Sequence, residues 1–224
     1  MSAFFITSTG TEIGKTLVTA AICHQLGAAG EKVRALKPII SGITDDDWAT
    51  SDSGIIADAL GLPASLDTLN ALSPFRYKAP LAPTMAAAAE GRTLDYGDLL
   101  KVCSGFLALD GIRLIEGVGG AFVPLSGRTL VADWIADLKL PSLMVTGSYL
   151  GTLSHSIATL EAMATRGLAV KAIVMSESAG EGHPDLYESA EALSKLVRLP
   201  VMALPRLKGD KPWTHAPDLT HLLS

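Results

Sequence analysis

Cysteine is scarce in this sequence, and its two cysteines exclude the usual cysteine-based sites. Cys23 and Cys103 lie far apart, and no C-x-x-C spacing occurs among the 224 residues. The five histidines are scattered, and no pair of them has the spacing of metal ligands. We therefore expect neither a disulfide nor a zinc site. Two reduced thiols in the core of a cytoplasmic protein are the simplest interpretation.

Aromatic residues and long apolar runs are also few. Aromatic residues make up 5% of the chain although hydrophobic residues make up 48%, which predicts an aliphatic core. No apolar run approaches the roughly 20 residues of a membrane-spanning helix, because Gly, Pro, Ser or charged residues interrupt the richest stretches. The chain enters a predicted strand directly, without a basic segment or a cleavage site, so no signal peptide is expected.

Basic residues are fewer than acidic ones: 18 lysine and arginine residues and 23 aspartate and glutamate residues give a formal net charge of −5. No basic cluster or ladder of aromatic residues is present. These features argue against a protein that binds nucleic acid. No Ser, His and Asp order typical of a catalytic triad is legible, so a covalent nucleophile is not expected.

Residues 7–16, Thr-Ser-Thr-Gly-Thr-Glu-Ile-Gly-Lys-Thr, carry the strongest functional signal. They lie between an apolar run at 3–6, predicted to be a strand, and a helical pattern at 17–26. A strand, a loop and a Gly-Lys-Thr helix start are typical of a phosphate-binding loop. Unpaired backbone N–H groups and the helix dipole favour an anion at such a helix N-terminus.

Three consecutive residues define what this loop can do. Gly14 lets the backbone approach a phosphate, Lys15 supplies a cation to the β- and γ-phosphates, and the Thr16 hydroxyl can bind Mg²⁺. The match to G-x-x-x-x-G-K-T is imperfect, because Thr9 stands where the first glycine belongs and Gly10 follows it. An ordinary strand-to-helix turn is the alternative, but the flanking strand, loop and helix favour phosphate binding.

The rest of the chain alternates apolar β-branched runs with helical patterns. Strands are predicted at 32–37, 111–116, 143–146, 170–175 and 201–204, helices at 51–60, 85–90, 95–109, 153–166 and 186–197, and a loop rich in Pro and Ser at 65–83. Strands separated by helices give right-handed βαβ units and a parallel sheet. The sequence therefore predicts one α/β domain over residues 1–224, P-loop NTPase-like, with a doubly wound, mainly parallel sheet and helices on both faces.

Polar residues at the strand ends are the next candidates, because ligands of such sheets bind outside the carboxyl ends of the strands. Lys37 is either a solvated strand end or a second cation that faces developing negative charge. Glu116 is followed by three glycines within four residues and is either part of a tight turn or a Mg²⁺ ligand. Asp52 is a helix N-cap, a third oxygen ligand for the metal, or both. The Gly/Ser/Thr-rich helix start at 147–155 can hold a second anion such as a carboxylate.

Five short motifs occur in a specific order along the chain. They are Thr-Glu-x-Gly-Lys-Thr at 11–16, Lys-Pro-x-x-Ser-Gly at 37–42, Ser-Asp at 51–52, Glu-Gly-x-Gly-Gly at 116–120 and Ala-Asp-Trp at 132–134. Together they resemble dethiobiotin synthetase, the ligase family of the biotin pathway. The resemblance runs over nearly the whole chain and is weakest beyond about residue 176. The P-loop alone is unspecific, whereas the order of all five motifs is specific.

The resemblance implies a homodimer that closes a ureido ring on 7,8-diaminononanoate with CO₂, ATP and Mg²⁺. It implies catalytic roles for Lys37, Lys15 and Thr11, and Mg²⁺ ligands in Thr16, Asp52 and Glu116. Nucleotide contacts are implied for Glu12, Ile13, Gly14, Lys15, Thr16, Leu17, Asp52, Glu116, Gly117, Val118, Gly119, Ser176, Pro205, Arg206 and Leu207. Substrate contacts are implied for Thr11, Lys37 and Ser41, and for Gly151, Thr152, Leu153 and Ser154 of the neighbouring subunit, which would bind the distal carboxylate.

Two segments depart from the family pattern. The family commonly has Gly-Thr-Asp-Thr where residues 8–11 here are Ser-Thr-Gly-Thr. It often has Asn-Asp, with the Asn reading adenine, where this chain has Ser176 and Glu177. Because serine lacks the paired donor and acceptor of asparagine, we predict relaxed nucleotide choice.

Two other functions use the same residues. A partner-regulated P-loop ATPase switch of the partitioning type would keep Lys15, Thr16 and the carboxylates. Such switches commonly carry an extra lysine near the start of the loop, which residues 8–10 do not supply. A non-catalytic binding homologue is the second alternative, but Lys15, Lys37, Thr16 and Glu116 are all retained. Nucleotide hydrolysis with the diamine and without a partner protein separates the three.

Overall fold

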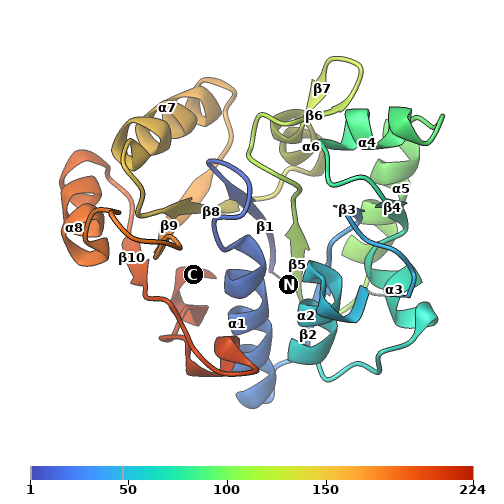
Figure 1. Ribbon diagram of the computed structural model, residues 1–224, viewed down its shortest axis with the longest axis horizontal. Helices are drawn as coiled ribbons and strands as arrows, with labels where there is room; N and C mark the ends of the chain where they lie inside the picture. Colours follow the sequence, from blue (N-terminus) through green and yellow to red (C-terminus); the bar gives the residue numbers. More distant parts are fainter. Residues whose placement is uncertain (1, 47, 224) are drawn as a thin grey trace.

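A six-stranded parallel sheet forms the centre of the computed structural model, which describes residues 2–46 and 48–223 (Figure 1). Its strands are β1 (Ala3–Ser8), β2 (Val33–Leu36), β5 (Ile112–Glu116), β8 (Ser142–Gly147), β9 (Val170–Ser176) and β10 (Val201–Leu204). The spatial order is β10-β9-β8-β1-β5-β2. The chain thus builds the sheet on one side of β1 and then on the other. The carboxyl ends of β1, β5 and β8 meet where the direction reverses, which is where ligands bind in such sheets.

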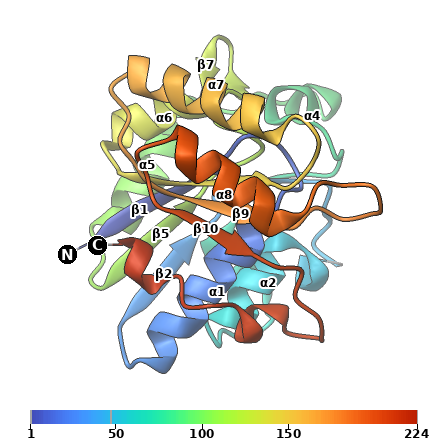
Figure 2. The same cartoon turned by 90° about the vertical axis from the view of Figure 1, so that its left-hand side faces the viewer.

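Helices cover both faces of this sheet (Figure 2). One face carries α1 (Lys15–Ala28), α2 (Asp52–Ala59), α3 (Leu66–Leu72) and the short 3₁₀ helices η2 (Pro212–His215) and η3 (Thr220–Leu223). The other carries α4 (Pro83–Ala89), α5 (Tyr96–Leu107), α6 (Val131–Leu138), α7 (Thr152–Thr165) and α8 (Leu186–Leu196). The predicted doubly wound architecture with helices on both faces is confirmed.

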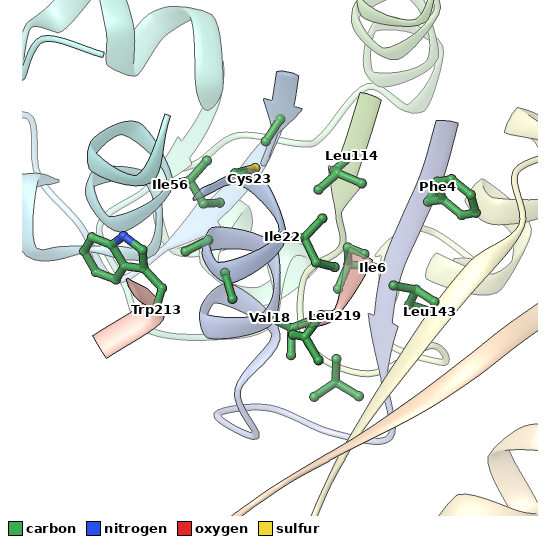
Figure 3. Close-up of a cluster of buried hydrophobic side chains, with 14 of the residues drawn as sticks. Phe4, Ile6, Val18, Ile22, Cys23, Ile56, Leu114, Leu143, Trp213 and Leu219 are labelled. Carbon is green, nitrogen blue, oxygen red and sulfur yellow. The ribbon is translucent and has the colours of Figure 1, made fainter. Parts of the chain in front are cut away.

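Alternate residues of β1 face opposite layers, because side chains alternate along a strand. Ile6 packs into the layer that holds Ile22 of α1, Trp213 and Leu219 (Figure 3). Phe5 lies in the other layer. The C-terminal segment, residues 205–223, belongs to the layer that contains α1, since Trp213, Leu219 and Leu222 are buried there.

Polar contacts also hold the C-terminal segment against α1. The Gln25 side chain donates to the carbonyl oxygens of Ala216 and Pro217, at 3.2 and 2.8 Å, and accepts the N–H of Leu219 at 2.9 Å. One glutamine on α1 thereby satisfies three backbone groups of the segment, which fixes the segment on the helix that begins at the phosphate-binding loop.

The two thiols behave as expected from the sequence. Cys23 and Cys103 are free and buried in different layers. Burial raises the pKa of Cys23 well above its ordinary value and raises that of Cys103 to about 12, so neither sulfur forms a thiolate at neutral pH. Over the described part of the chain, no helix is both long and apolar enough to cross a bilayer.

The predicted loop at 65–83 is wrong. It contains α3, the strand β4 (Phe75–Tyr77) and the first residue of α4, and β4 pairs in parallel with the strand β3 (Ile39–Ser41). Serine and proline act as helix-start residues here: the Ser65 side chain accepts the N–H of Thr68, and Pro83 opens α4. The sequence also did not predict α6 or the hairpin of β6 (Pro124–Ser126) and β7 (Thr129–Leu130).

Candidate active site

The loop between β1 and α1 has the backbone geometry of an anion site. Gly14 is the N-cap of α1 and has a φ of 95°, a left-handed conformation that glycine adopts without strain. A Cβ atom at this position would lie 2.6 Å from the Ser176 hydroxyl oxygen, so no side chain fits. No side chain of the described residues caps the start of α1. Its first N–H groups are therefore ready to bind phosphate oxygens.

Lys15 is buried and is held by the beginning of its own loop. Its Nζ donates to the Ser8 hydroxyl at 3.1 Å and lies 3.4 Å from the carbonyl oxygen of Gly10. The Ser8 hydroxyl lies within hydrogen-bond distance of the carbonyl oxygens of Gly10 and Gly119, at 2.7 and 2.9 Å, and has one proton to donate to them. This role of Ser8 was not predicted, because it depends in part on Gly119, more than a hundred positions away.

The electrostatic environment of Lys15 favours an anionic ligand. Burial, together with the nearby ammonium of Lys37, lowers the pKa of Lys15 to about 8, and Glu116 and Asp52 offset this only in part. Two ammonium groups buried close together repel each other until negative charge arrives. A phosphate or a carbamate would supply that charge.

Lys37 directly follows β2 and is buried, with 3% of its surface exposed, so the solvated strand end is wrong. Its Nζ lies 2.7 Å from Glu116 Oε1 and 3.1 Å from Asp52 Oδ2. Burial alone would lower the pKa of Lys37, but the two carboxylates outweigh burial and raise it above its ordinary value. Lys37 therefore remains a cation at neutral pH.

Asp52 does not cap α2, so that part of the interpretation is wrong. Ser51 is the N-cap, and Asp52 is the first helical residue, with its carboxylate turned toward Lys37. Burial would raise the pKa of Asp52, but the Lys37 ammonium outweighs burial and holds the pKa below its ordinary value. The carboxylate is therefore ionised at neutral pH.

The three predicted Mg²⁺ ligands, Thr16, Asp52 and Glu116, meet around Lys37. The Thr16 hydroxyl donates to Glu116 Oε1 at 2.8 Å. Among the described residues, Glu116 Oε2 is buried without a hydrogen-bond partner, which a cation would correct. No group of three or more His, Cys, Asp or Glu side chains able to hold a metal occurs in residues 2–46 and 48–223. Two carboxylates and a hydroxyl do fit Mg²⁺, which binds proteins through few ligands and takes others from phosphates and water.

A cavity of about 720 Å³ opens at these groups. Its polar lining includes the loop from Thr11 to Thr16 with Lys37, Ser41 and Asp52, and Val118 and Gly119 also line it. Its apolar part is formed by Ile40, Ile43, Pro80, Leu81, Ala82, Pro83 and Val123. Residues 80–83 were missed because they fall in the predicted loop; their apolar character within a loop was the available signal. One cavity is thus lined by both charged groups and hydrocarbon surface.

A second cavity of about 420 Å³ lies on the other side of Gly14. Of the predicted nucleotide contacts, Glu12, Ile13, Leu17, Ser176, Arg206 and Leu207 line it. Within the described residues, Pro205 does not line this cavity. Glu177 and His183 do line it, although we did not predict them. The Glu177 carboxylate accepts the N–H of Arg206 at 2.7 Å and so joins the end of β9 to the C-terminal segment.

Comparisons with known proteins show the family to which this chain belongs. The chain matches a family model described as an AAA domain over residues 2–209. It is 41% identical over 215 residues to the ATP-dependent dethiobiotin synthetase BioD of Methylobacterium nodulans, covering 93% of this chain and 95% of the relative. It is 40% identical over 227 residues to that of a Caulobacter species, covering 100% and 95%. The chain belongs to the dethiobiotin synthetase family.

Solved structures support the fold of this dethiobiotin synthetase family member. A ParA family ATPase from Chlorobium tepidum matches with a TM-score of 0.51 and 18% identity, over 94% of this chain and 84% of that one. The MinC:MinD cell division complex of Aquifex aeolicus matches with a TM-score of 0.53 and 13% identity, over 92% and 81%. At such identities the likeness shows a shared P-loop fold and nothing about the reaction.

The four predicted carboxylate-binding residues lie apart from the two cavities. Gly151 is the N-cap of α7 with a φ of 98°, and Thr152, Leu153 and Ser154 form its first turn. In the described part of the chain, none of the four lines either cavity. Next to them, Leu150 is 86% exposed. Their contact with a substrate held by a neighbouring subunit remains a prediction.

Proposed function

We propose that this chain is an ATP-dependent dethiobiotin synthetase. It carboxylates 7,8-diaminononanoate with CO₂ and closes the ureido ring, and it releases ADP and phosphate. The observation that carries this proposal is the buried Lys37 ammonium, which lies between Glu116 and Asp52. Lys37 lines the same cavity as the phosphate-binding loop and the apolar residues 80–83, in a chain of this family. A nucleotide switch needs Lys15 and Thr16 to bind and hydrolyse nucleotide, but it does not need a second buried lysine in a cavity that is partly lined by apolar residues.

The first step forms a carbamate. A neutral amine of the substrate attacks the carbon of CO₂, a C–N bond forms, one C=O electron pair moves to oxygen, and the nitrogen loses a proton. The new anion lies where Lys37 and Lys15 can stabilise it, and Thr11 and Ser41 line the same cavity and can hydrogen-bond the carbamate. The hydrocarbon chain of the substrate lies against the apolar wall formed in part by residues 80–83.

The second and third steps use the nucleotide. A carbamate oxygen attacks the γ-phosphorus, the bond to ADP breaks, and a carbamic-phosphoric anhydride forms. The second amine then attacks the anhydride carbonyl carbon, loses a proton and expels phosphate as the ring closes. Lys15 and the N–H groups at the start of α1 hold the phosphates in line and balance their charge. The base occupies the cavity beside Ser176.

Thr16, Asp52 and Glu116 are the residues that would hold Mg²⁺. When bound, the ion would neutralise charge on the β- and γ-phosphates. Glu116 Oε2 offers it an acceptor with no competing hydrogen bond from the described residues, while Oε1 is taken by Thr16 and Lys37. Lys37 thereby fixes the orientation of a carboxylate that keeps one oxygen free of hydrogen bonds from the described residues, and that oxygen would be able to bind the ion.

The active unit is proposed to be a cytoplasmic homodimer. Residues 151–154 of one subunit would bind the distal carboxylate of the diamine held by the other, because the N-terminus of a 14-residue helix attracts anions. The exposed Leu150 beside this turn fits a position at a subunit contact.

Phosphate release measured with substrates omitted in turn tests the proposal. Release should require 7,8-diaminononanoate, CO₂ and Mg²⁺ together, and mass spectrometry should find dethiobiotin in the same reaction. Thr16→Val serves as the control that weakens Mg²⁺-dependent use of ATP. If ATP is hydrolysed equally well without the diamine, the ligase proposal is wrong and the switch is favoured.

A further inference from the structure

A chain of hydroxyl groups joins the phosphate-binding loop to the first turn of α7. The Thr9 hydroxyl lies 3.1 Å from that of Thr146 on β8, which lies 3.0 Å from that of Thr152. Thr152 donates to the carbonyl oxygen of Gly147, and Ser156 donates to Thr146 at 2.9 Å. Thr146, Thr152 and Ser156 are buried. The nucleotide loop and a helix start about 140 residues later in the sequence thus share one polar network.

The hydrogen bonds of this network can point in only one direction. A threonine hydroxyl has one proton to donate. Because Thr152 gives its proton to the Gly147 carbonyl, it must accept one from Thr146, and Thr9 must therefore donate to Thr146. Each hydroxyl proton in the network thus has one acceptor. Thr146 accepts hydrogen bonds from Thr9 and Ser156 and donates one to Thr152. A fully satisfied buried network of this kind holds its members rigidly, because breaking a link leaves a polar group unpaired.

The network also gives a use to the threonine that replaces the first glycine of the strict loop motif. The Thr9 backbone N–H donates to the carbonyl oxygen of Val145 at 3.0 Å, which continues the pairing of β1 with β8. The Thr9 side chain then binds the next residue of β8, Thr146. The start of the loop is thereby attached to β8 at two neighbouring points, and the end of β8 is attached to α7.

We propose that Thr146 is a positioning residue that couples the phosphate-binding loop to the first turn of α7. A nucleotide that orders the loop fixes Thr9, and through Thr146 it fixes Thr152. A second ligand at α7 then binds with less ordering left to do, which is positive cooperativity. That the second ligand is the diamine carboxylate rests on the proposed function, which assigns residues 151–154 to it.

Calorimetry tests the coupling directly. The Kd of 7,8-diaminononanoate is measured with and without a saturating non-hydrolysable ATP analogue, and the ratio is the coupling factor. We expect a factor of about 5 to 150 in the wild type, the usual range of coupling between sites. Thr9→Val and Thr146→Val should bring it close to 1, and Thr146→Ser should keep it. Thr165→Val is the control, because it removes an α7 hydroxyl that donates to the Glu161 carbonyl oxygen of the same helix and takes no part in the network.

Thr9→Val is the decisive variant, since Thr9 lies in the nucleotide loop and reaches α7 only through Thr146. A wild-type factor of 1, an unchanged factor in Thr9→Val, or an equal loss in Thr165→Val would overturn the proposal. Hydrogen exchange at residues 152–156 gives a readout that needs no diamine. The analogue should increase protection there in the wild type and not in Thr9→Val. A wild type that shows this protection but binds no diamine refutes the proposed function and retains the coupling.

Discussion

Replacing Lys37 with glutamine removes the cation that lies between Glu116 and Asp52 while leaving a hydrogen-bond donor. If the Lys37 ammonium stabilises the carbamate, its contribution appears only as charge develops, so the substitution should lower kcat and hardly change the affinity for ATP. Loss of one such donor typically costs on the order of 10²–10³ in turnover, roughly 3–4 kcal/mol. Lys15 and the loop backbone remain to bind the phosphates.

The same change has a cost in stability that follows from burial. Glu116 is fully buried, and removing its cationic partner leaves an uncompensated charge, which typically destabilises a fold by about 3–5 kcal/mol. For a chain of this length about 1 kcal/mol corresponds to roughly 2–4 °C in Tm, so a fall of about 6–20 °C is expected. Lys101→Gln is the control: its ion pair with Asp98 is exposed, so its loss should leave Tm nearly unchanged.

Steady-state kinetics with ATP and with the diamine, run at a temperature where circular dichroism shows a folded variant, give the answer. Near-normal turnover in folded Lys37→Gln would refute the catalytic role. A rise in the KM for ATP that matches the whole loss in kcat/KM would also refute it, because Lys37 would then bind nucleotide rather than carbamate.

Three further results are expected. Ser8→Gly removes the hydroxyl that holds the Lys15 ammonium; since a hydrogen bond to a charged group contributes about 1.5–3 kcal/mol, the KM for ATP should rise about tenfold or more, and an unchanged KM would show that Ser8 does not position the lysine. Thr16→Val and Glu116→Gln should shift the Mg²⁺ dependence of phosphate release to higher concentration in a folded protein, and a variant with the wild-type dependence is not a metal ligand. GTP and CTP should compete with ATP in side-by-side binding measurements, because Ser176 lacks the paired donor and acceptor that would select adenine; strong preference for ATP would mean that backbone groups read the base.

The parts of the site that the sequence predicted are those governed by local pattern and strand-end geometry. Lys15 and Thr16 follow from the loop motif, and Glu116 from its place at the end of a buried strand. The role of Lys37 was ambiguous from spacing alone, because its burial depends on Asp52 and Glu116, which are distant from it in the sequence. Burial between two carboxylates is what distinguishes it from a solvated lysine.

The features that the sequence did not predict depend on contacts between distant segments. Strands β3 and β4 have three residues each and are stabilised by pairing with each other, so neither gives a strong periodic signal. The role of Ser8 requires the carbonyl oxygen of Gly119, and the role of Thr9 requires Thr146. The assignment of residues 151–154 to the substrate carboxylate concerns contacts with a second subunit. It therefore stays a prediction.

The attachment of the C-terminal segment to α1 has a practical consequence for anyone who shortens this protein. The family model ends at residue 209, yet Trp213, Leu219 and Leu222 are buried against the helix that begins at Lys15. A recombinant chain cut at the family boundary would lose these side chains and the backbone groups that Gln25 binds. An apolar face of α1 would then meet water. A domain boundary taken from the alignment alone would therefore remove part of the core.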